Sequence, residues 1–476
     1  MNQHEVPLFH TLLQHVRKKT SSYHVPGHKN GRVGSDEFLT YFHSVLPFDL
    51  TELRGLDDLH HPTGVIAFSE RLLADLYQTT KSKFLVNGST AGNLAMILAS
   101  VHPGDEVFVQ RDSHQSVFHA LELAQAKPIL MPSLIDEKTK MVVGIETKQL
   151  IEEMKKHPNS KVAIFTYPNY YGMGQSLEHL FSWMHEQDMT ILVDEAHGAH
   201  FSLHSFFPKS ALEMGADVVV QSAHKTLPAM TMGAFLHIQS SYKYQEKLNQ
   251  VLQMIQTSSP SYPIMASLDY ARYYAAHFTN QSVQQLLKKR DDFIQRLKEI
   301  PQIQVVFSGK GFVQDPLKIT IQSQTNLTGY ELQQELENVN IYTELADIER
   351  VLFVLPLSER FDGTEVVKAL TTILQERPVC KKRTLSFLPK MTQVKYFKYS
   401  YQELYEQTIK QVSLEQSVGK IAAESIIPYP PGIPFIMKGE QIEREQVRVL
   451  QILQQHHTYF QGNDGRKIQV YDGRKE

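Results

Sequence analysis

Between residues 80 and 240, short apolar runs alternate with longer segments whose apolar residues recur at every third or fourth position. The short runs predict buried strands, and the longer segments predict amphipathic helices. Regular alternation of the two predicts βαβ units, in which parallel strands form a sheet that helices cover on both faces. The strands are predicted at residues 83–87, 105–110, 161–167, 189–194 and 216–221. No other feature of the chain restricts its fold as strongly.

The pattern changes after residue 300. Shorter predicted strands, at residues 317–322 and 350–357, alternate there with amphipathic helices, which is typical of a smaller α+β unit. The proline-containing stretch IIPYPPGIPFIMKGE indicates an extended loop near the C-terminus. Three parts are predicted for the 476 residues. They are an N-terminal arm with a large domain over residues 1–300, a small α+β domain over residues 301–380 and a C-terminal extension over residues 381–476.

Charge and cysteine content limit the partners of the chain. The 48 Lys and Arg residues nearly balance the 51 Asp and Glu residues, so no overall charge attracts nucleic acid or an anionic membrane. The single cysteine, Cys380, cannot form an intramolecular disulfide, and the N-terminal residues lack the apolar core of a secretory signal. No apolar run approaches the roughly 18 residues that span a bilayer. We expect a cytoplasmic protein that acts on a small molecule.

Polar side chains follow each of the predicted strands, in the sequences NGST, RDSH, TYPNYYG, DEAHGAH and QSAHKT. Ligands of open α/β sheets bind outside the carboxyl ends of the strands, so these groups are expected to share a pocket. The first sequence places Ser89 and Thr90 at the start of a predicted helix, where hydroxyl and backbone N–H groups suit a phosphate. An ordinary helix N-cap is the alternative interpretation.

The sequence DEAHGAHF at residues 194–201 has three interpretations. A helicase motif is excluded because the chain contains no GxxxxGK[ST] phosphate loop. A metal site at His197, His200 and His204 is disfavoured because no HExxH motif or cysteine pair completes a ligand set, so no metal is predicted. The third interpretation makes Asp194 a buried carboxylate that needs a cationic partner.

Lys225 follows the last of the five strands in the sequence QSAHKT. A lysine at a strand end usually extends its amine into solvent. Here, however, the chain also supplies the acid at Asp194 and the donors Ser222 and His224, besides the predicted phosphate site. An amine for a Schiff base, an acid for a pyridinium nitrogen and donors for a phosphate are the groups that hold pyridoxal 5'-phosphate. Lys225 is therefore predicted to bind this cofactor covalently.

Further stretches resemble motifs of the bacterial ornithine/lysine/arginine decarboxylases, which are fold-type-I, pyridoxal-phosphate-dependent enzymes. In chain order they are HVPGHKNG, DLTELRGLDDLHHPTGVI, VNGSTAGN, RDSHQSV, DEAHGAHF, SAHKTL, TSSPSYPIMASLD and PYPPGIPFIMKGE. The resemblance covers nearly the whole chain. It implies an α/β large domain like that of aspartate aminotransferase, with a mainly parallel sheet, and a smaller α+β C-terminal domain.

The resemblance also implies roles for single residues around the cofactor. Lys225 resembles the Schiff-base lysine and Asp194 the partner of the ring nitrogen. His114 resembles the aromatic side chain stacked on the ring, and Ala196 would pack beneath it. The implied phosphate ligands are Ser89, Thr90, Ser222 and His224, with Thr257 supplied by the neighbouring subunit of a homodimer.

The implied reaction is the decarboxylation of arginine, lysine or ornithine to the corresponding amine, a step of polyamine biosynthesis. His197 and His224 are candidates for proton transfer, although each also fits a purely hydrogen-bonding role. An aminotransferase that uses Lys225 and Asp194 is the alternative, because the sequence does not reveal which Cα bond is broken. Since HVPGHK begins at His24, the chain resembles the short form of the family, and assemblies built through an N-terminal wing domain are not expected.

A basic substrate needs a carboxylate near its distal cation. Five acidic residues lie in motifs that resemble those near the family's site, and each also fits a surface charge. They are Asp49, Glu52, Asp57, Asp58 and Glu440. The expected order of substrates is arginine, then lysine, then ornithine.

Overall fold

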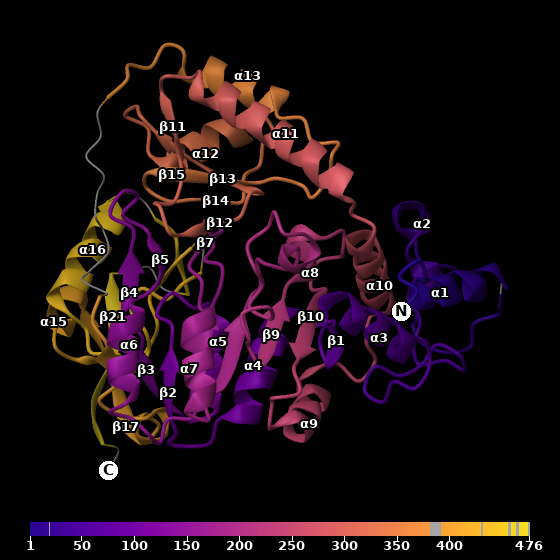
Figure 1. The fold of residues 1–476 in the computed structure, drawn as a ribbon, viewed down its shortest axis with the longest axis horizontal. Helices are drawn as coiled ribbons and strands as arrows, with labels where there is room; N and C mark the ends of the chain where they lie inside the picture. Colours follow the sequence, from indigo (N-terminus) through magenta and orange to yellow (C-terminus); the bar gives the residue numbers. More distant parts are fainter. Residues whose placement is uncertain (19, 381–391, 430–431, 456–457, 463–465, 475–476) are drawn as a thin grey trace. The chain divides into compact units, whose positions relative to one another are not determined.

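The structure, a computed structural model, describes residues 1–18, 20–380, 392–429, 432–455, 458–462 and 466–474 (Figure 1). The predicted start of the C-terminal extension at Lys381, and Pro430 and Pro431 of its extended loop, lie outside these residues. The chain divides into two compact units. The first comprises residues 1–100, 190–205 and 209–278, and the second comprises residues 101–189, 206–208 and 279–476.

The first unit contains a sheet with the strand order β1-β10-β9-β8. Strand β9 is parallel to β8, whereas β10 is antiparallel to both β9 and β1. Strands β1, β8 and β9 therefore run in one direction, and their carboxyl ends lie at the same edge of the sheet. The strands are β1 (Lys81–Leu85), β8 (Thr190–Asp194), β9 (Val218–Gln221) and β10 (Ala234–Ile238).

The helices of the first unit are α1 (Pro7–Arg17), α2 (Asp36–Phe42), α3 (Val65–Tyr77), α4 (Gly88–Ser100), α8 (Ala223–Thr226), α9 (Gln245–Ile255) and α10 (Tyr262–Ala276), with the short helices η1 (Leu46–Phe48) and η2 (Phe201–Leu203). Helix α4 packs on the sheet and against α9 (Figure 1). Gly92 allows this close approach, since an added Cβ atom would lie 2.7 Å from Leu85 and 2.8 Å from Val220. The packing places the N-terminus of α4 at the carboxyl edge of the strands.

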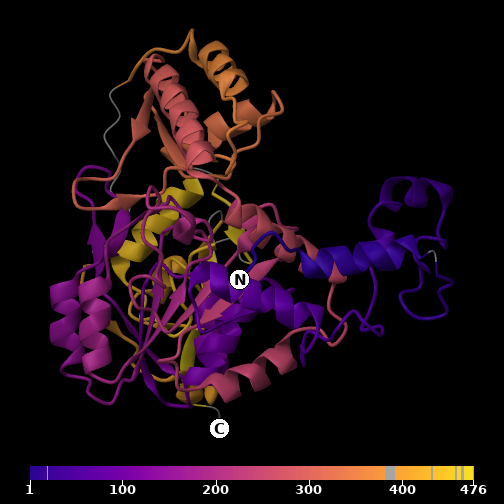
Figure 2. The same cartoon turned by 45° about the vertical axis from the view of Figure 1, so that its right-hand side comes forward.

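The N-terminal arm is anchored to the first unit through α10. Leu8 and Phe9 donate their backbone N–H groups to the carboxylate of Asp269, which also forms an ion pair with Arg272 at 3.0 Å. Arg272 in turn donates to the carbonyl groups of Gln3 and Glu5. After α1, the chain extends away from the strands of this unit (Figure 2).

The second unit contains the remaining predicted strands of the large domain. Its first sheet has the order β6-β2-β3-β16, in which β6, β2 and β3 are parallel and β16 is antiparallel. These strands are β2 (Glu106–Val109), β3 (Lys127–Leu130), β6 (Val162–Thr166) and β16 (Lys395–Tyr396). The accompanying helices are α5 (Gln115–Leu123), α6 (Thr147–Met154) and α7 (Glu178–Glu186), and a short hairpin is formed by β4 (Ser133–Ile135) and β5 (Val142–Ile145).

An antiparallel sheet of the order β11-β13-β15-β14 forms the predicted α+β part of the second unit. Its strands are β11 (Ile303–Val306), β13 (Lys318–Ser323), β14 (Leu345–Ala346) and β15 (Arg350–Val354). The helices beside it are α11 (Asn280–Lys298), α12 (Gly329–Glu337) and α13 (Thr364–Leu374). A separate pair joins β12 (Val313–Gln314) to β7 (Met173–Gly174).

The C-terminal part of the second unit has its own apolar core beneath a three-stranded antiparallel sheet. Its elements are α14 (Tyr401–Leu404), β17 (Gln407–Ser413), α15 (Leu414–Ser417), β18 (Ile421–Ala422), β19 (Ile427–Pro428), α16 (Arg444–Gln455), β20 (Phe460–Gln461) and β21 (Lys467–Arg474). The α/β class and all five predicted strands of the large domain are confirmed, as β1, β2, β6, β8 and β9. Strand β10 was not predicted. No described helix has the length and apolarity needed to cross a membrane.

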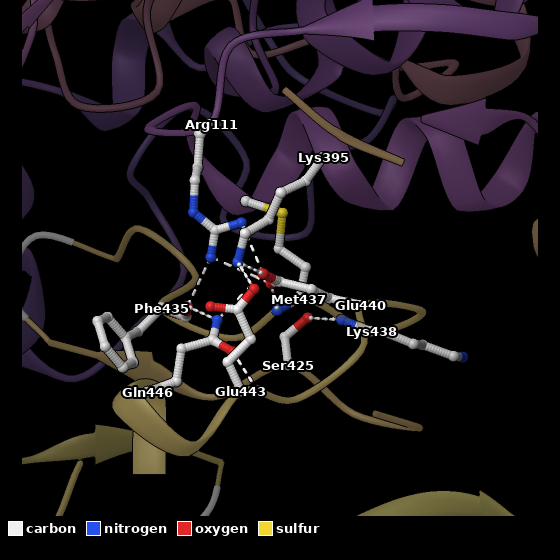
Figure 3. A network of polar contacts seen from close by, with 9 residues as sticks. All are labelled: Arg111, Lys395, Ser425, Phe435, Met437, Lys438, Glu440, Glu443 and Gln446. Atoms are coloured by element: carbon white, nitrogen blue, oxygen red, sulfur yellow. Dashed lines mark hydrogen bonds and ion pairs between the residues drawn. The ribbon is translucent and has the colours of Figure 1, made fainter. Parts of the chain in front are cut away.

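Glu440 holds the C-terminal part against β2 through a buried ion pair. Figure 3 shows the guanidinium group of Arg111 and the amine of Lys395 converging on the Glu440 carboxylate. Arg111 binds both carboxylate oxygens, at 2.9 and 3.1 Å, and donates to the carbonyl of Phe435 at 2.9 Å. Gln446 donates to the same carboxylate at 3.0 Å. Glu440 is 3% exposed, so its charge serves this network and does not lie on the surface.

Candidate active site

Polar groups from three segments meet at the carboxyl edge of β1, β8 and β9 in the first unit. Ser222, directly after β9, donates its hydroxyl to that of Ser89 at 2.9 Å, in the first turn of α4. Thr90 follows with an exposed side chain. At Gly88 the backbone has a φ of +77°, and an added Cβ atom would meet nothing within 4 Å. Hydroxyl groups and the start of a 13-residue helix thus lie together beside open space, as an anion site requires.

Asp194 is the last residue of β8 and is 3% exposed. Its two oxygens accept from the Asn93 amide nitrogen at 2.8 Å and from the backbone N–H of Ala196 at 3.1 Å. No cationic side chain among the described residues pairs with it. A buried carboxylate is costly unless a cation compensates it. The site therefore has the acid that a protonated ring nitrogen needs.

Lys225 lies in the single turn of α8, with its amine 3.0 Å from Nε2 of His197. A lysine ammonium group can only donate, so this ring nitrogen accepts and the other one, Nδ1, carries the ring proton of a neutral imidazole. His197 is 6% exposed, whereas Lys225 is half-buried. Removal of a proton from Lys225 by His197 would give the neutral amine that reacts with an aldehyde.

His224 and Ala196 support the segment that carries Lys225. The ring of His224 donates from Nδ1 to the carbonyl of Gly233 at 3.0 Å, because a carbonyl only accepts. Nε2 is then the nitrogen through which His224 would contact a phosphate. The carbonyl of Ala196 accepts from the backbone N–H of Ser222 at 3.3 Å. The amine, the buried acid and the hydroxyl groups therefore fit the functional groups of pyridoxal 5'-phosphate.

The remaining predicted cofactor residues are His114 and Thr257. His114 belongs to the second unit, where it caps α5: its Nδ1 accepts from the backbone N–H of Ser116 at 3.2 Å, so Nε2 carries the proton. Thr257 belongs to the first unit, has an exposed side chain and donates its backbone N–H to Asn87 at 3.3 Å. Asn87 directly precedes the predicted phosphate site of the same chain.

Four of the five acids considered for the substrate have partners within the chain, among them Asp58, which accepts from the backbone N–H of His60 at 2.8 Å. Asp57 accepts backbone N–H groups from five residues and thereby caps the start of α3, and Glu440 is held by Arg111. The donors to Asp57 are Asp58, Thr63, Gly64, Ile66 and Ala67. Asp49 lies 3.2 Å from His28, and Glu52 is exposed. Within the described residues, no group of His, Cys, Asp or Glu side chains is arranged to hold a metal ion.

Asn93 was not predicted as a site residue. It follows Ser89 by four positions, and residues at this spacing share one face of a helix, so the sequence NGSTAGN contains a signal for it. Only the packing of α4 across the sheet shows that this face meets Asp194.

Glu195, next to Asp194, ends a buried chain of hydrogen bonds. Its carboxylate is fully buried and accepts from the Ser210 hydroxyl, the Ala211 N–H and the Gln221 amide nitrogen, each at 2.7 Å. Burial raises the pKa of Glu195 to about 8, although these three donors act in the opposite direction. The adjacent positions of Asp194 and Glu195 thus face different surroundings.

The direction of this chain follows from its donors. Gln221 donates through its amide nitrogen, so its oxygen accepts from Nε2 of His237 at 3.1 Å, and Nδ1 of His237 accepts from Ser82 at 2.7 Å. Burial lowers the pKa of His237 to about 3, which keeps the ring neutral. The bonds connect β1, β10 and β9 to the residue after β8 and therefore hold the site's strands in register.

Wild-type protein is expected to lose stability, relative to the Glu195→Gln variant, as the pH rises from about 4.5 to about 8. In the unfolded chain Glu195 ionises near its ordinary pKa of 4.5, whereas in the folded chain it keeps its proton up to a pH of about 8. Across this interval the folded state binds more protons, so its stability falls as protons are removed, by about 1.4 kcal/mol for each unit between the two pKa values. Urea unfolding of both proteins across this pH range measures the effect. A constant difference between them would mean that Glu195 is ionised in the folded protein.

The sequence matches two models of one family. Residues 6–310 match the major domain of the Orn/Lys/Arg decarboxylases, and residues 380–467 match their C-terminal domain. The uncharacterized protein YaaO of Bacillus subtilis strain 168 is 43% identical over 461 residues, which are 96% of each chain. An arginine decarboxylase of the same strain is 31% identical over 459 residues, covering 94% of this chain and 93% of that protein.

Solved structures show the same fold. The lysine decarboxylase LdcF of Francisella novicida has a TM-score of 0.82 at 20% identity, covering 98% of this chain and 81% of that one. A ureidoglycine–glyoxylate aminotransferase of Bacillus subtilis has a TM-score of 0.52 at 13% identity, covering 67% of this chain and 87% of that one. The predicted fold-type-I architecture is confirmed. By the match of its family models and its relatives, the chain belongs to the Orn/Lys/Arg decarboxylase family, whose members depend on pyridoxal phosphate.

Proposed function

We propose that the protein uses pyridoxal 5'-phosphate to decarboxylate a basic amino acid, arginine, lysine or ornithine, to its amine and carbon dioxide. The observation that carries the proposal is the arrangement at one sheet edge of the Lys225 amine, the buried Asp194 carboxylate and the start of α4. The family and the related arginine decarboxylase of Bacillus subtilis support the reaction class. Arginine is the first substrate to test.

The bound cofactor supplies an electron sink for the carbanion that remains when carbon dioxide leaves. Asp194, oriented by Asn93 and Ala196, keeps a proton on the ring nitrogen and so stabilises the negative charge that develops in the reaction. His197, 3.0 Å from the Lys225 amine, would accept the proton of that amine and return it. Ser89, Thr90, Ser222 and His224 would hold the phosphate. The resemblance to the family assigns His114 and Ala196 to the ring.

Product analysis tests the proposal. Purified protein with added cofactor is incubated separately with arginine, lysine and ornithine, and carbon dioxide and the amines are measured. Stoichiometric release of carbon dioxide and one amine is expected. Transfer of the amino group to a 2-oxo acid without carbon dioxide would establish an aminotransferase, a reaction that the fold also supports.

The proposal includes a homodimer, for which the segment after α1 provides a surface. Large apolar side chains are concentrated there, and exposed apolar patches of this kind mark protein interfaces. They are Tyr23, Val25, Val33, Phe38, Tyr41, Phe42 and Val45, of which Tyr23 is 96% exposed. A second copy of the chain is the partner that we propose to cover them.

A mixed dimer tests whether Thr257 serves the neighbouring site. Thr257→Asp places a carboxylate against the phosphate and Lys225→Ala removes the covalent bond, so each homodimer is expected to be inactive. If Thr257 acts across the dimer, each mixed dimer has one intact site, and random reassortment restores about a quarter of wild-type activity. Thr257 donates its backbone N–H to Asn87 of its own chain, so a role in its own chain's site is the alternative that the experiment separates from a shared site. Isolated mixed dimers with no activity would show that Thr257 acts within its own chain.

A further inference from the structure

The second unit contains a cavity of about 270 Å³. Aromatic rings form much of its wall: Tyr170, Tyr171, Tyr330 and Phe435. Aliphatic side chains from β5, α16 and the loop after residue 432 complete it. A cavity of this size and lining suits the aliphatic part of a small molecule. The polar groups in its wall determine which molecule binds.

Most charges in the cavity wall are matched by the protein. Arg111 forms its ion pair with Glu440 (Figure 3). Arg350 lies 3.2 Å from Asp347 and 3.2 Å from Glu349. Lys140 lines the cavity but is exposed to solvent. Within the cavity, therefore, neither buried guanidinium group has an unbalanced positive charge to offer.

Asp112 differs from the other acids of the wall because none of these ion pairs includes it. Its side chain lines the cavity and accepts a hydrogen bond from the amide of Gln110 at 2.9 Å, but no cationic group of the described chain forms an ion pair with it. The neighbouring guanidinium of Arg111 binds Glu440 instead. Burial raises the pKa of Asp112, and the hydrogen bond from Gln110 and the attraction of the Arg111 guanidinium offset this only in part. A carboxylate among tyrosine rings attracts a cation, because the ring faces also carry negative potential.

We propose that Asp112 recognises the distal cation of the substrate, an ammonium or guanidinium group, in this cavity. The inference rests on the proposed function, which places His114 on the cofactor ring. Asp112 precedes His114 by two residues, and two residues of chain span at most about 7 Å. The distal nitrogen of a basic amino acid lies at a similar distance from its reacting Cα atom. The Cα atoms of Asp112 and His114 are therefore no farther apart than the length of such a substrate, so a single molecule with its reacting end beside His114 could extend its distal nitrogen towards Asp112.

The C-terminal part of the unit connects the cavity to His114. Pro428, Ile433 and Phe435 line the cavity, and a Cβ atom added at Gly432 would lie 3.9 Å from Nε2 of His114. Arg111 holds Phe435 through its backbone carbonyl. The same loop therefore borders both the proposed cation site and the residue proposed to cover the cofactor.

Kinetics of Asp112→Asn test the assignment on the holoenzyme, with the basic amino acid that the wild type converts fastest. Loss of one hydrogen-bonded counter-ion is expected to raise KM roughly 10- to 150-fold, with a smaller change in kcat, because the contact serves the ground state and the transition state equally. The preference for lysine over norleucine, which lacks only the distal ammonium group, should fall by a similar factor. Asp112→Glu, which keeps the charge, should restore part of it.

The matched control is Glu137→Gln. Glu137 is an exposed carboxylate of the same unit, three residues before Lys140, and does not line the cavity. This variant should keep the wild-type KM. The visible absorbance of the bound cofactor should be unchanged in all three variants, which separates substrate recognition from cofactor loss. If Asp112→Asn kept the wild-type KM and the preference for lysine while wild type was active, the assignment of Asp112 would be wrong and the proposed function would stand.

Calorimetry gives an answer that does not need turnover. Cadaverine and agmatine are titrated into wild type and Asp112→Asn, with 1,5-pentanediol as the uncharged probe. Both amines should bind the wild type at least about tenfold more tightly than the variant, and the diol should not distinguish them. Amine binding that depends on Asp112 in a protein without decarboxylase activity would overturn the proposed function alone. Equal amine affinity in both proteins would overturn the cation site.

Discussion

Replacement of Lys225 by alanine is expected to abolish turnover and the visible absorbance of the bound cofactor. No other residue is proposed to attach the cofactor, so the variant loses the covalent bond and, with it, the proton exchange with His197 at 3.0 Å. The fold should persist, since Lys225 lies at a half-buried site edge and its side chain fills no core position. Absorbance spectra, carbon dioxide release and the circular dichroism spectrum check the three expectations.

Lys247→Ala is the control for Lys225→Ala. Lys247 is an exposed lysine of α9 in the same unit, and its removal should leave both absorbance and turnover at wild-type values. Persistence of the cofactor absorbance in Lys225→Ala would assign the covalent attachment to another amine.

Asp194→Ala is expected to lower kcat at least about 10²-fold while the protein stays folded. Asp194 is the acid that we propose to hold a proton on the ring nitrogen, and without it that nitrogen would lose the proton that makes the cofactor an electron sink. Asp194→Glu keeps the charge but displaces it, and should lower kcat less than Asp194→Ala does. Carbon dioxide release under saturating substrate and cofactor measures each variant.

Asn93→Ala provides a graded comparison, because it removes one of the two hydrogen bonds that orient Asp194 and leaves its charge in place. Its effect on kcat should be smaller than that of Asp194→Ala. Turnover near the wild-type rate in Asp194→Ala would show that a different acid faces the ring nitrogen.

The large domain was predictable because its signals are local. Burial of both faces of a strand gives a continuous apolar run, and such runs identified β8 and β9 within one or two residues of their observed ends. The carboxyl ends of parallel strands meet at one edge, so the joint position of Asp194, Ser222 and Lys225 followed from topology. Strand β10 was not predicted, although its run AFLHI is also apolar, because it joins β9 as an antiparallel neighbour and so lies outside the βαβ pattern.

The role of each acidic residue could not be predicted from such local signals. In the sequence, no local signal separates the roles of Asp57, Asp112 and Glu440. In the structure, Asp57 accepts backbone N–H groups at the start of α3, and Glu440 binds a guanidinium group 329 positions away in the chain. Asp112 was not predicted as a site residue, because nothing in its motif, RDSH, distinguishes it from an acid on the surface.

By itself, the sequence determined the family and the five predicted strands of the large domain, since apolar periodicity and the residue types after each strand are properties of neighbouring positions. Which charges remain uncompensated was decided by the tertiary structure alone. A carboxylate is neutralised by whatever folding brings within a few ångströms, and Coulomb energy depends on that distance and on burial rather than on sequence separation. The C-terminal part packs on β2, and this packing brings Glu440 into an ion pair with Arg111. The same packing leaves Asp112, the next residue along the chain, in the wall of a cavity and outside the ion pairs of the described residues.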